Sequence, residues 1–369
     1  MDVILNDNNK MPSLGFGTWH LAGEKGIEVF KTAIKLGYRC FDTAEAYGNE
    51  SELGIAINEC IRDGLIKRED VFIATKINPH NPIGYNNTIK AFNNSLERLN
   101  LDYIDLYMIH WPNLVVDDSW KNLNAETWRA MEDLQKQGKI RSLGISNFMI
   151  HHIKTLLNTA RILPAINQIN FNPTWQQREL IKYCNEKNIQ VVAWAPVVRI
   201  KDWNKKILNQ VAEKYNKSVP QICLRYCLQN NVIPLSCSKN PDHMKENLSV
   251  TEFSINQEDM KILDTLNSHP WDHDSQPDCL YEIFRQRELL SQKKHVIKEA
   301  FYLFNFFKIL QIIRKSENCV LFLLFGIIPL LKFKNINEQK TKCYFLGIIR
   351  IGTIRRKVQT TYTPQLPVY

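Results

Sequence analysis

The chain has 369 residues, which is too long for one small core and suits a barrel-sized domain of about 250 residues plus an extension. Hydrophobic residues make up 44% and charged residues 23%, as in soluble globular proteins, and the nine cysteines lack the spacing of a disulfide framework or a zinc site, so we expect reduced cysteines in a cytoplasmic protein. From Ser275 onward there are 16 Lys/Arg and 6 Asp/Glu, so the +9 net charge lies in this tail, and the near-neutral remainder predicts no nucleic-acid partner.

Short apolar segments alternate with segments of helical period before this tail. Stretches such as 26–36 and 88–99 repeat apolar residues at three and four positions, as amphipathic helices do. Eight runs are predicted to be strands: Leu14–Thr18, Arg39–Thr43, Val71–Lys76, Ile104–Trp111, Ser142–Ser146, Ala165–Phe171, Gln190–Trp194 and Val232–Leu235. Strands that alternate with helices run parallel, and eight close a barrel, so we predict an α/β fold of the (β/α)8 TIM-barrel type. Residues 3–5 and 10–12 predict a hairpin at its floor.

An open, doubly wound sheet would give a similar pattern of buried strands. That fold usually carries a glycine-rich phosphate turn, GxGxxG, after its first strand. Here Gly15-Phe16-Gly17 is followed by Thr18, Trp19 and His20, so the third glycine is missing. The closed barrel is therefore the favoured prediction.

Polar residues follow three neighbouring strands where each one ends. Asp42 and Tyr47, in the stretch FDTAEAYGNE, follow the second strand, Lys76 ends the third, and His110 lies at the end of the fourth. Each has an ordinary explanation as a solvated strand end or a core residue. In a closed parallel barrel, however, the carboxyl ends of the strands meet, so all four side chains are expected in one small volume.

These four residue types support one kind of chemistry. A free tyrosine, with a pKa of about 10, is a poor proton donor near neutral pH. A lysine ammonium beside it stabilises the phenolate, an aspartate holds that lysine, and a neutral histidine can orient a carbonyl oxygen. No metal-ligand cluster and no thiol or serine beside a base accompanies the set, so we expect no metal and a hydride supplied by a bound cofactor.

The chain resembles the aldo-keto reductases, and most closely their bacterial 2,5-diketogluconate-reductase-like members. The resemblance covers about residues 1–267 and rests on five motifs in family order: FDTAEAYGNE, the ATK of Val71–Lys76, LYMIHWP, GKIRSLGISNF and INQINFNP. It implies NAD(P)H-dependent reduction of an aldehyde or ketone, sugar-like or small and polar. Asp42, Tyr47, Lys76 and His110 would form the catalytic tetrad, with Tyr47 as the proton donor.

The resemblance also assigns residues to the cofactor and the substrate. It implies that the cofactor is bound by Thr18, Ser146, Asn147, Gln168, Trp194, Ser238, His243 and Asn247, with Ser146 and Asn147 on the carboxamide and Trp194 stacked on the nicotinamide. Trp19 and Trp111 would line the substrate mouth. Where NADPH-preferring relatives have a lysine and an arginine for the 2′-phosphate, this chain has Cys237 and His243. Preference between NADPH and NADH therefore stays open.

The tail departs from the family pattern, and we predict a linker at 268–290 and a basic, hydrophobic extension at 291–369. Glu299–Lys315 is apolar with a basic end, which predicts an interfacial helix, and Cys319–Leu331 is too short to span a membrane. A repeat, Leu324–Lys334 and Tyr344–Lys357, resembles repeats at the ends of some bacterial surface-polysaccharide glycosyltransferases. We expect a peripheral membrane contact or a contact with an envelope-biosynthesis enzyme; an extension without a function is the alternative.

Two other functions remain open beside the reductase. A cofactor-sensing module would keep the barrel but turn over slowly, although an intact tetrad argues against it. A scaffold would use the tail to localise the barrel. Reductase assays distinguish the first, and deletion of the tail distinguishes the second.

Overall fold

The computed structural model describes residues 2–78, 84–112, 119–197 and 202–267, and five strands between residues 310 and 355. Contacts divide the chain into two compact units, Met1–Phe284 and Arg285–Tyr369. Residues 268–309, which contain the predicted linker, lie outside the described part, so the predicted boundaries stay predictions.

Eight parallel strands close into a barrel, which confirms the predicted fold. Around the barrel they are β10 (Val232–Ser236), β3 (Gly15–Gly17), β4 (Cys40–Asp42), β5 (Phe72–Ile77), β6 (Ile104–Ile109), β7 (Ile140–Ser146), β8 (Ile166–Asn170) and β9 (Gln190–Trp194). Asp42 pairs with Ala74, and Lys76 pairs with Met108. This parallel register brings the carboxyl ends of β4, β5 and β6 to the same end of the barrel.

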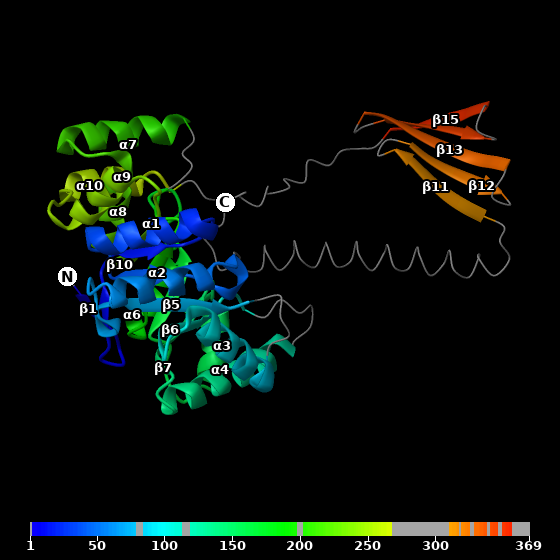
Figure 1. Cartoon of the computed structure of the whole chain (residues 1–369). Helices are drawn as coiled ribbons and strands as arrows, with labels where there is room; N and C mark the ends of the chain where they lie inside the picture. Colours follow the sequence, from blue (N-terminus) through cyan, green and yellow to red (C-terminus); the bar gives the residue numbers. More distant parts are fainter. Residues whose placement is uncertain are drawn as a thin grey trace. The chain divides into compact units, whose positions relative to one another are not determined.

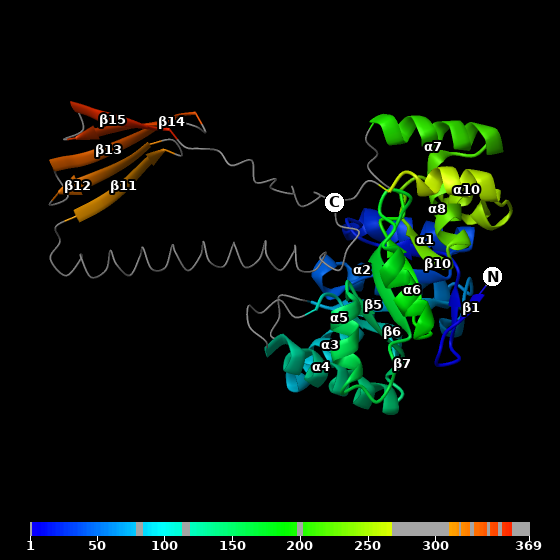
Figure 2. The ribbon, with the colours of Figure 1, turned by 180° about the vertical axis from the view of Figure 1, so that it is seen from behind.

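Helices lie outside the strands in both views of the barrel (Figures 1 and 2). They are α1 (Gly23–Leu36), α2 (Glu50–Arg62), α3 (Tyr85–Leu99), α4 (Ser119–Lys136), α5 (Ile150–Leu157), α6 (Arg178–Glu186), α7 (Asp202–Tyr215), α8 (Val219–Gln229), α9 (Pro241–Leu248) and α10 (Gln257–Asp264). The predicted helices 26–36 and 88–99 fall within α1 and α3, and each observed helix begins about one turn earlier.

The strands are apolar because both of their faces are covered. Every residue of β5 and of β6 is buried. One cluster of side chains fills the barrel interior and includes Cys40, Phe72 and Leu106, while a larger cluster packs the strands against the helices. A wall packed on both sides holds the strand ends, and the side chains that follow them, in fixed positions.

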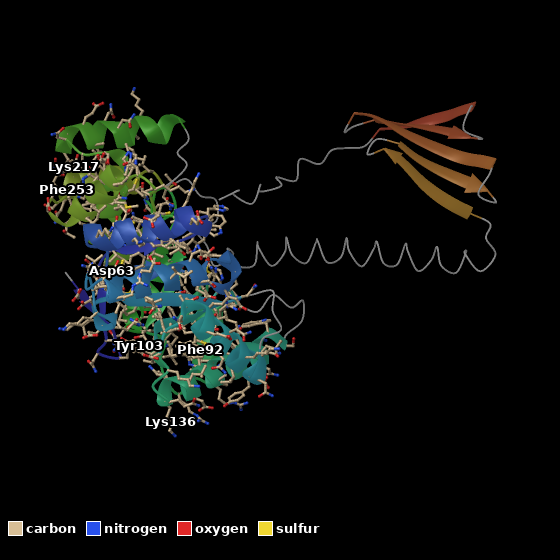
Figure 3. The ribbon with its side chains drawn as sticks, in the orientation of Figure 1. Asp63, Phe92, Tyr103, Lys136, Lys217 and Phe253 are labelled. Carbon is tan, nitrogen blue, oxygen red and sulfur yellow. The ribbon has the colours of Figure 1, made fainter. Side chains whose placement is uncertain are left out.

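The amino-terminal end of the barrel is closed by the predicted hairpin, β1 (Asp2–Ile4) and β2 (Lys10–Pro12), which pair antiparallel. Leu5 and Met11 of this hairpin are buried in the interior cluster. Beside it, the ring of Tyr103, which is labelled in Figure 3, packs against two guanidinium groups, with Arg68 3.9 Å and Arg141 4.1 Å from its centroid. Both arginines pair with the buried Asp105, at 2.7 and 3.3 Å. We call Arg68, Tyr103, Asp105 and Arg141 the floor cluster.

Helices α2 and α3 pack closely against each other beside β5. A Cβ atom on Gly54 of α2 would collide with the backbone of Leu99 in α3, so glycine permits the close approach. The contact fixes the start of α2, which directly follows Tyr47, relative to the end of α3.

The C-terminal unit contains a five-stranded antiparallel sheet: β11 (Leu310–Ser316), β12 (Cys319–Leu324), β13 (Ile328–Asn337), β14 (Lys340–Phe345) and β15 (Ile349–Arg355). The predicted interfacial helix is wrong over residues 310–315, which form β11, and its first part lies outside the described residues. Each copy of the repeat begins at the end of one strand and continues into the next, from β12 into β13 and from β14 into β15. Among the described residues, no helix is long and apolar enough to cross a membrane.

Candidate active site

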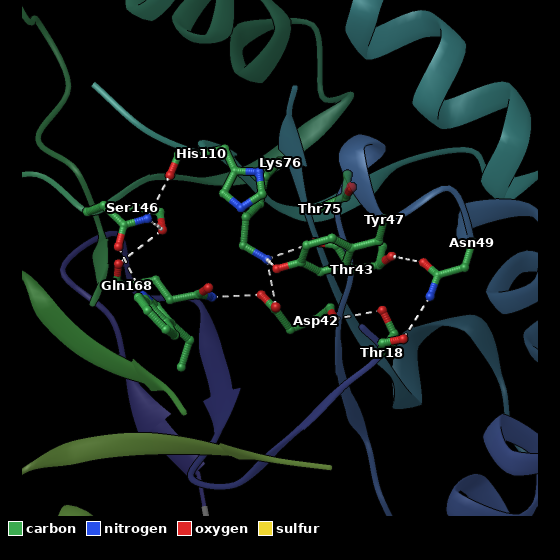
Figure 4. A network of polar contacts seen from close by, with 12 residues as sticks. Thr18, Asp42, Thr43, Tyr47, Asn49, Thr75, Lys76, His110, Ser146 and Gln168 are labelled. Atoms are coloured by element: carbon green, nitrogen blue, oxygen red, sulfur yellow. Dashed lines mark hydrogen bonds and ion pairs between the residues drawn. The ribbon is translucent and has the colours of Figure 1, made fainter. Parts of the chain in front are cut away.

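The four residues predicted to form a tetrad come together at the carboxyl end of the barrel (Figure 4). Asp42 is the last residue of β4, Lys76 lies near the end of β5, and His110 directly follows β6. Tyr47 lies in η1 (Glu45–Tyr47), the 3-10 turn that connects β4 to α2. Proximity in space was therefore predictable from strand order alone.

Lys76 is the centre of the group and is fully buried. Its Nζ donates to Asp42 Oδ2 at 2.6 Å and to the carbonyl oxygen of Thr43 at 2.9 Å. It also lies 3.4 Å from Tyr47 Oη, the longest of the three contacts. The ammonium is thus held by two oxygens of β4 and its following turn, and its third contact is the phenol.

The electrostatics of this pair follow from burial and charge. Burial lowers the pKa of Lys76, but Asp42 and Tyr47 outweigh it, so the net pKa lies above the ordinary value and the side chain is an ammonium. For Tyr47, burial raises the pKa, Lys76 lowers it as expected, and Asp42 raises it; the net pKa is raised. Lysine therefore acts in the predicted direction, but burial has the larger effect. Tyr47 carries its proton near neutral pH, as a proton donor must.

Two aromatic rings lie close to the ring of Tyr47. The His110 ring meets the Tyr47 ring edge-on, with centroids 5.7 Å apart and planes at 78°. The Trp19 ring lies 6.3 Å from the Tyr47 ring and is 36% exposed, so it borders solvent. Trp111 is half-buried directly after β6 and His110. Both predicted mouth tryptophans thus lie on segments next to the phenol.

Asp42 links the tetrad to the residues predicted to bind the cofactor. Its second oxygen, Oδ1, accepts from Gln168 Nε2 at 2.7 Å. The backbone carbonyl oxygen of Gln168 accepts from Ser146 Oγ at 3.0 Å and from the backbone N–H of Asn147 at 2.8 Å. Gln168, Ser146 and Asn147 offer both donors and acceptors, which is the set that a carboxamide requires. The resemblance assigns these residues to the nicotinamide end of the cofactor, and that role stays a prediction.

Trp194 reaches this group from the end of β9. Its indole N–H donates to Asn147 Oδ1 at 2.9 Å. The Asn147 amide in turn donates to the carbonyl oxygen of His110 at 3.0 Å and to Ser146 Oγ at 3.1 Å. The backbone of Asn147 has a φ of 61°, a left-handed conformation that asparagine tolerates better than most residues. The indole thus fixes which way the Asn147 amide points.

The other predicted cofactor residues are Thr18, Ser238, His243 and Asn247. Thr18 is fully buried, and its hydroxyl donates to the Asp42 carbonyl oxygen at 3.1 Å. Ser238 Oγ accepts from the Asn240 N–H at 3.1 Å at the start of α9. His243 is exposed on α9, whereas Asn247 is buried and hydrogen-bonds the Tyr38 hydroxyl. Their roles toward a cofactor stay predictions.

Sequence reasoning missed several residues that hold the site together. Asn49 donates to the carbonyl oxygens of Thr18 and Leu21 at 2.7 and 2.8 Å, so it fixes the loop that carries Trp19. Glu50 pairs with Arg98 of α3. The only sequence signal was the Asn-Glu that follows Tyr47 within FDTAEAYGNE. In the described part of the chain, no group of three or more His, Cys, Asp or Glu could hold a metal ion.

Comparison with known proteins identifies the barrel. A model described as the aldo/keto reductase family matches residues 13–199 and 201–268. Glyoxal reductase of Bacillus subtilis is 43% identical over 266 residues, which cover 72% of this chain and 92% of that protein. The crystal structure of an aldo/keto reductase from Brucella melitensis has 37% identity and a TM-score of 0.67, over 72% of this chain and 99% of that one. A Bombyx mori aldo-keto reductase in complex with NADP has 33% identity and a TM-score of 0.67, over 74% of this chain and 94% of that one.

Proposed function

Because this chain belongs to the aldo/keto reductase family and is an NAD(P)H-dependent oxidoreductase, we propose that it reduces a small polar or sugar-like aldehyde or ketone to the alcohol, with Tyr47 as the proton donor. The observation that carries this proposal is the position of the buried Lys76 ammonium, 2.6 Å from Asp42 and 3.4 Å from the Tyr47 hydroxyl. A cation placed there stabilises the phenolate that remains once the proton has left.

The reaction requires a proton at oxygen and a hydride at carbon. The substrate carbonyl oxygen would lie between the Tyr47 hydroxyl and the His110 ring, which polarise it and set its direction. Reduced nicotinamide, when bound, supplies the hydride to the carbonyl carbon. The Tyr47 proton moves to the oxygen, which completes the alcohol, and Lys76 stabilises the resulting phenolate. Because Tyr47 is only half-buried, solvent can return the proton.

Three side chains would hold the nicotinamide against this site. Ser146, Asn147 and Gln168 present the donors and acceptors for its carboxamide, and Gln168 is bonded to Asp42 at 2.7 Å. The Trp194 ring would cover one face of the nicotinamide. A cofactor held by groups that also contact the tetrad is presented at a fixed distance from the carbonyl, which is how positioning lowers a reaction barrier.

The substrate would be small and polar. The Trp19 ring lies 6.3 Å from the Tyr47 ring, Trp111 directly follows His110, and the Bacillus subtilis relative is named for its action on glyoxal. A panel of glyoxal, methylglyoxal, D-xylose and an aromatic aldehyde, each with NADPH and with NADH, tests this. We expect the highest kcat/KM for the small dicarbonyls. No turnover of any carbonyl with either cofactor would favour the alternative, a low-turnover cofactor-binding or scaffold module.

For the tail we propose binding to an anionic surface, separate from catalysis, which would make the protein peripheral at a membrane or beside an envelope-biosynthesis enzyme. Its support is the charge of the segment after Ser275, with 16 Lys/Arg against 6 Asp/Glu. Basic residues near an anionic leaflet contribute about 1 kcal/mol each. Full-length protein should sediment with anionic but not neutral vesicles and be released by high salt, and a chain cut after Asn267 should stay in solution. Equal behaviour of the two forms would refute it.

A further inference from the structure

Two carboxylates flank Tyr47 in the chain, and both reach back to the strand that carries Lys76. Glu45 lies two residues before Tyr47 in η1, and Glu50 lies three residues after it, at the start of α2. Glu50 contacts Thr75 of β5, Glu45 contacts Asn78 directly after β5, and both approach Arg98 of α3.

Glu50 is bound on both of its oxygens although its side chain is only 1% exposed. Oε1 accepts from the Thr75 hydroxyl at 2.6 Å, and Thr75 immediately precedes Lys76. Oε2 accepts from Arg98 Nε at 2.7 Å and lies 2.6 Å from its second nitrogen. A buried carboxylate is stable only when it is paired in this way, so Arg98 is what allows Glu50 to hold β5.

Glu45 also connects the Tyr47 turn to the chain near Lys76. Its Oε2 accepts from the backbone N–H of Asn78, two residues after Lys76, at 3.0 Å. Its Oε1 lies 3.7 Å from the same Arg98 nitrogen that contacts Glu50. One guanidinium therefore lies near both carboxylates, and the two carboxylates contact Thr75 and Asn78, on either side of Lys76 in the chain.

We propose that Arg98 is a positioning residue, which clamps the Tyr47 turn to β5 through Glu45 and Glu50 and so sets the distance between the Tyr47 hydroxyl and the Lys76 ammonium. The inference rests on the proposed function, since it concerns the geometry of that proton donor. Arg98 itself contacts no residue of the tetrad. Its side chain is 35% exposed, so it is reachable from solvent and is not part of the barrel core.

Charge explains why one residue has this effect. Without the guanidinium, two carboxylates near the same point repel each other and lose their shared cation, and Glu50 is left buried with Thr75 as its partner. The least costly response is for η1 and the start of α2 to move outward. Tyr47 would move with them, because it lies between the two glutamates, while Lys76 stays fixed by Asp42 and Thr43.

The test compares Arg98→Met, Arg98→Lys and Glu45→Gln with a control, Arg68→Gln. Arg68 forms a buried pair of the same kind with Asp105, but at the opposite end of the barrel. Kinetics use methylglyoxal, or whichever carbonyl of the panel is turned over best. A displacement of about 1 Å at a reacting group can lower turnover about 10²-fold. We expect Arg98→Met to lower kcat about 10- to 100-fold with the KM and the cofactor Kd within about twofold, and to increase the solvent deuterium isotope effect.

The remaining variants separate positioning from stability. Arg98→Lys should recover part of kcat, because it restores the charge without the fork that reaches both glutamates. Glu45→Gln, which keeps the acceptor for Asn78, should lower kcat less than Arg98→Met. Arg68→Gln should lower the melting temperature with kcat unchanged. Unchanged kcat in a folded Arg98→Met protein, or an equal loss in Arg68→Gln, would overturn the inference. If Tyr47→Phe also turned over normally, the proposed function itself would be refuted.

Discussion

The barrel holds two buried ion clusters, one at each end, and they differ in what surrounds them. At the floor, Asp105 contacts Arg68, Arg141 and the backbone N–H of Ile73, with Tyr103 between the arginines. At the carboxyl end, Lys76 contacts Asp42, the Thr43 carbonyl and Tyr47. In the floor cluster, the carboxylate contacts two guanidinium groups and a backbone N–H, which fix its position. At the other end, one contact of Lys76 is with the phenol of Tyr47, which would lose its proton in the proposed reaction.

A buried ion pair can either order the residues around it or change the proton equilibrium of a neighbouring group. A buried ion pair orders the residues around it, at a cost in desolvation. Burial raises the pKa of Asp105, and Arg68 and Arg141 lower it without fully offsetting burial. The charge at the floor is therefore tolerated and structural. The charge of Lys76 lies beside the phenol of Tyr47, so it changes the proton equilibrium that the proposed reaction would use.

The largest effect should follow from Lys76→Met. It removes the charge that stabilises the Tyr47 phenolate and leaves Asp42 buried without its cation, so turnover should fall about 10²- to 10⁴-fold or more. Steady-state kinetics with the best carbonyl of the panel would measure this. A Lys76→Met enzyme with near wild-type kcat would erase the distinction between the two clusters.

Arg68→Gln should act on stability alone. Breaking a buried pair costs about 3–5 kcal/mol, so the free energy of unfolding should fall by an amount of that order at neutral pH. Because the pKa of Asp105 is raised in the folded protein, its protonated form favours folding. This stabilisation is fully present below the unfolded pKa and is lost as pH rises through the folded pKa. In acid, Asp105 is protonated in both states and needs no cation, so the loss of stability caused by Arg68→Gln should be smaller there. Denaturant unfolding at several pH values measures it, and a pH-independent loss would contradict the assignment.

Most of the site followed from the order of strands along the chain. Asp42, Lys76 and His110 were predicted from the strand ends, because the carboxyl ends of the strands in a closed parallel barrel lie at the same end of the barrel. Arg98 could not be found this way: it lies on an amphipathic helix, and its link to Glu50 depends on how closely α2 and α3 pack at Gly54.

In the tail, by contrast, the predicted interfacial helix was wrong over the residues that form β11. The run Glu299–Lys315 is apolar with a basic end, and periodicity alone does not distinguish a short apolar helix from a buried strand. Its final residues form β11, which pairs with β12. The two strands are joined by a short turn, and β12 lies outside the run from which the helix was predicted, so the composition of that run did not reveal its pairing partner.

A smaller effect is expected from Trp194. Removing its ring in Trp194→Ala should raise the NADPH Kd about tenfold, since an aromatic contact contributes about 0.5–1.5 kcal/mol beyond its buried area. Trp194→Phe keeps a ring but loses the N–H that orients Asn147, so its Kd should lie between those of the wild type and Trp194→Ala. Equal Kd values for all three proteins would move the stacking role elsewhere.

The smallest effect concerns the choice between NADPH and NADH. If Cys237 and His243 occupy the positions of the lysine and the arginine that hold the 2′-phosphate, as the resemblance implies, NADPH should be preferred by less than about tenfold. Titrations of the protein with NADPH and with NADH give the two Kd values and so measure this preference. A large NADPH preference would assign the phosphate to another cation, such as Lys239.

We propose that Tyr47 gives its proton to the carbonyl oxygen and that Lys76 stabilises the phenolate left behind. Single-turnover hydride transfer in Tyr47→Phe tests it most directly, because the change removes one hydroxyl and keeps the ring. We predict a cofactor Kd within about twofold of wild type and a rate lower by about 10²- to 10⁴-fold. A Tyr47→Phe enzyme that transfers hydride at the wild-type rate would contradict the account.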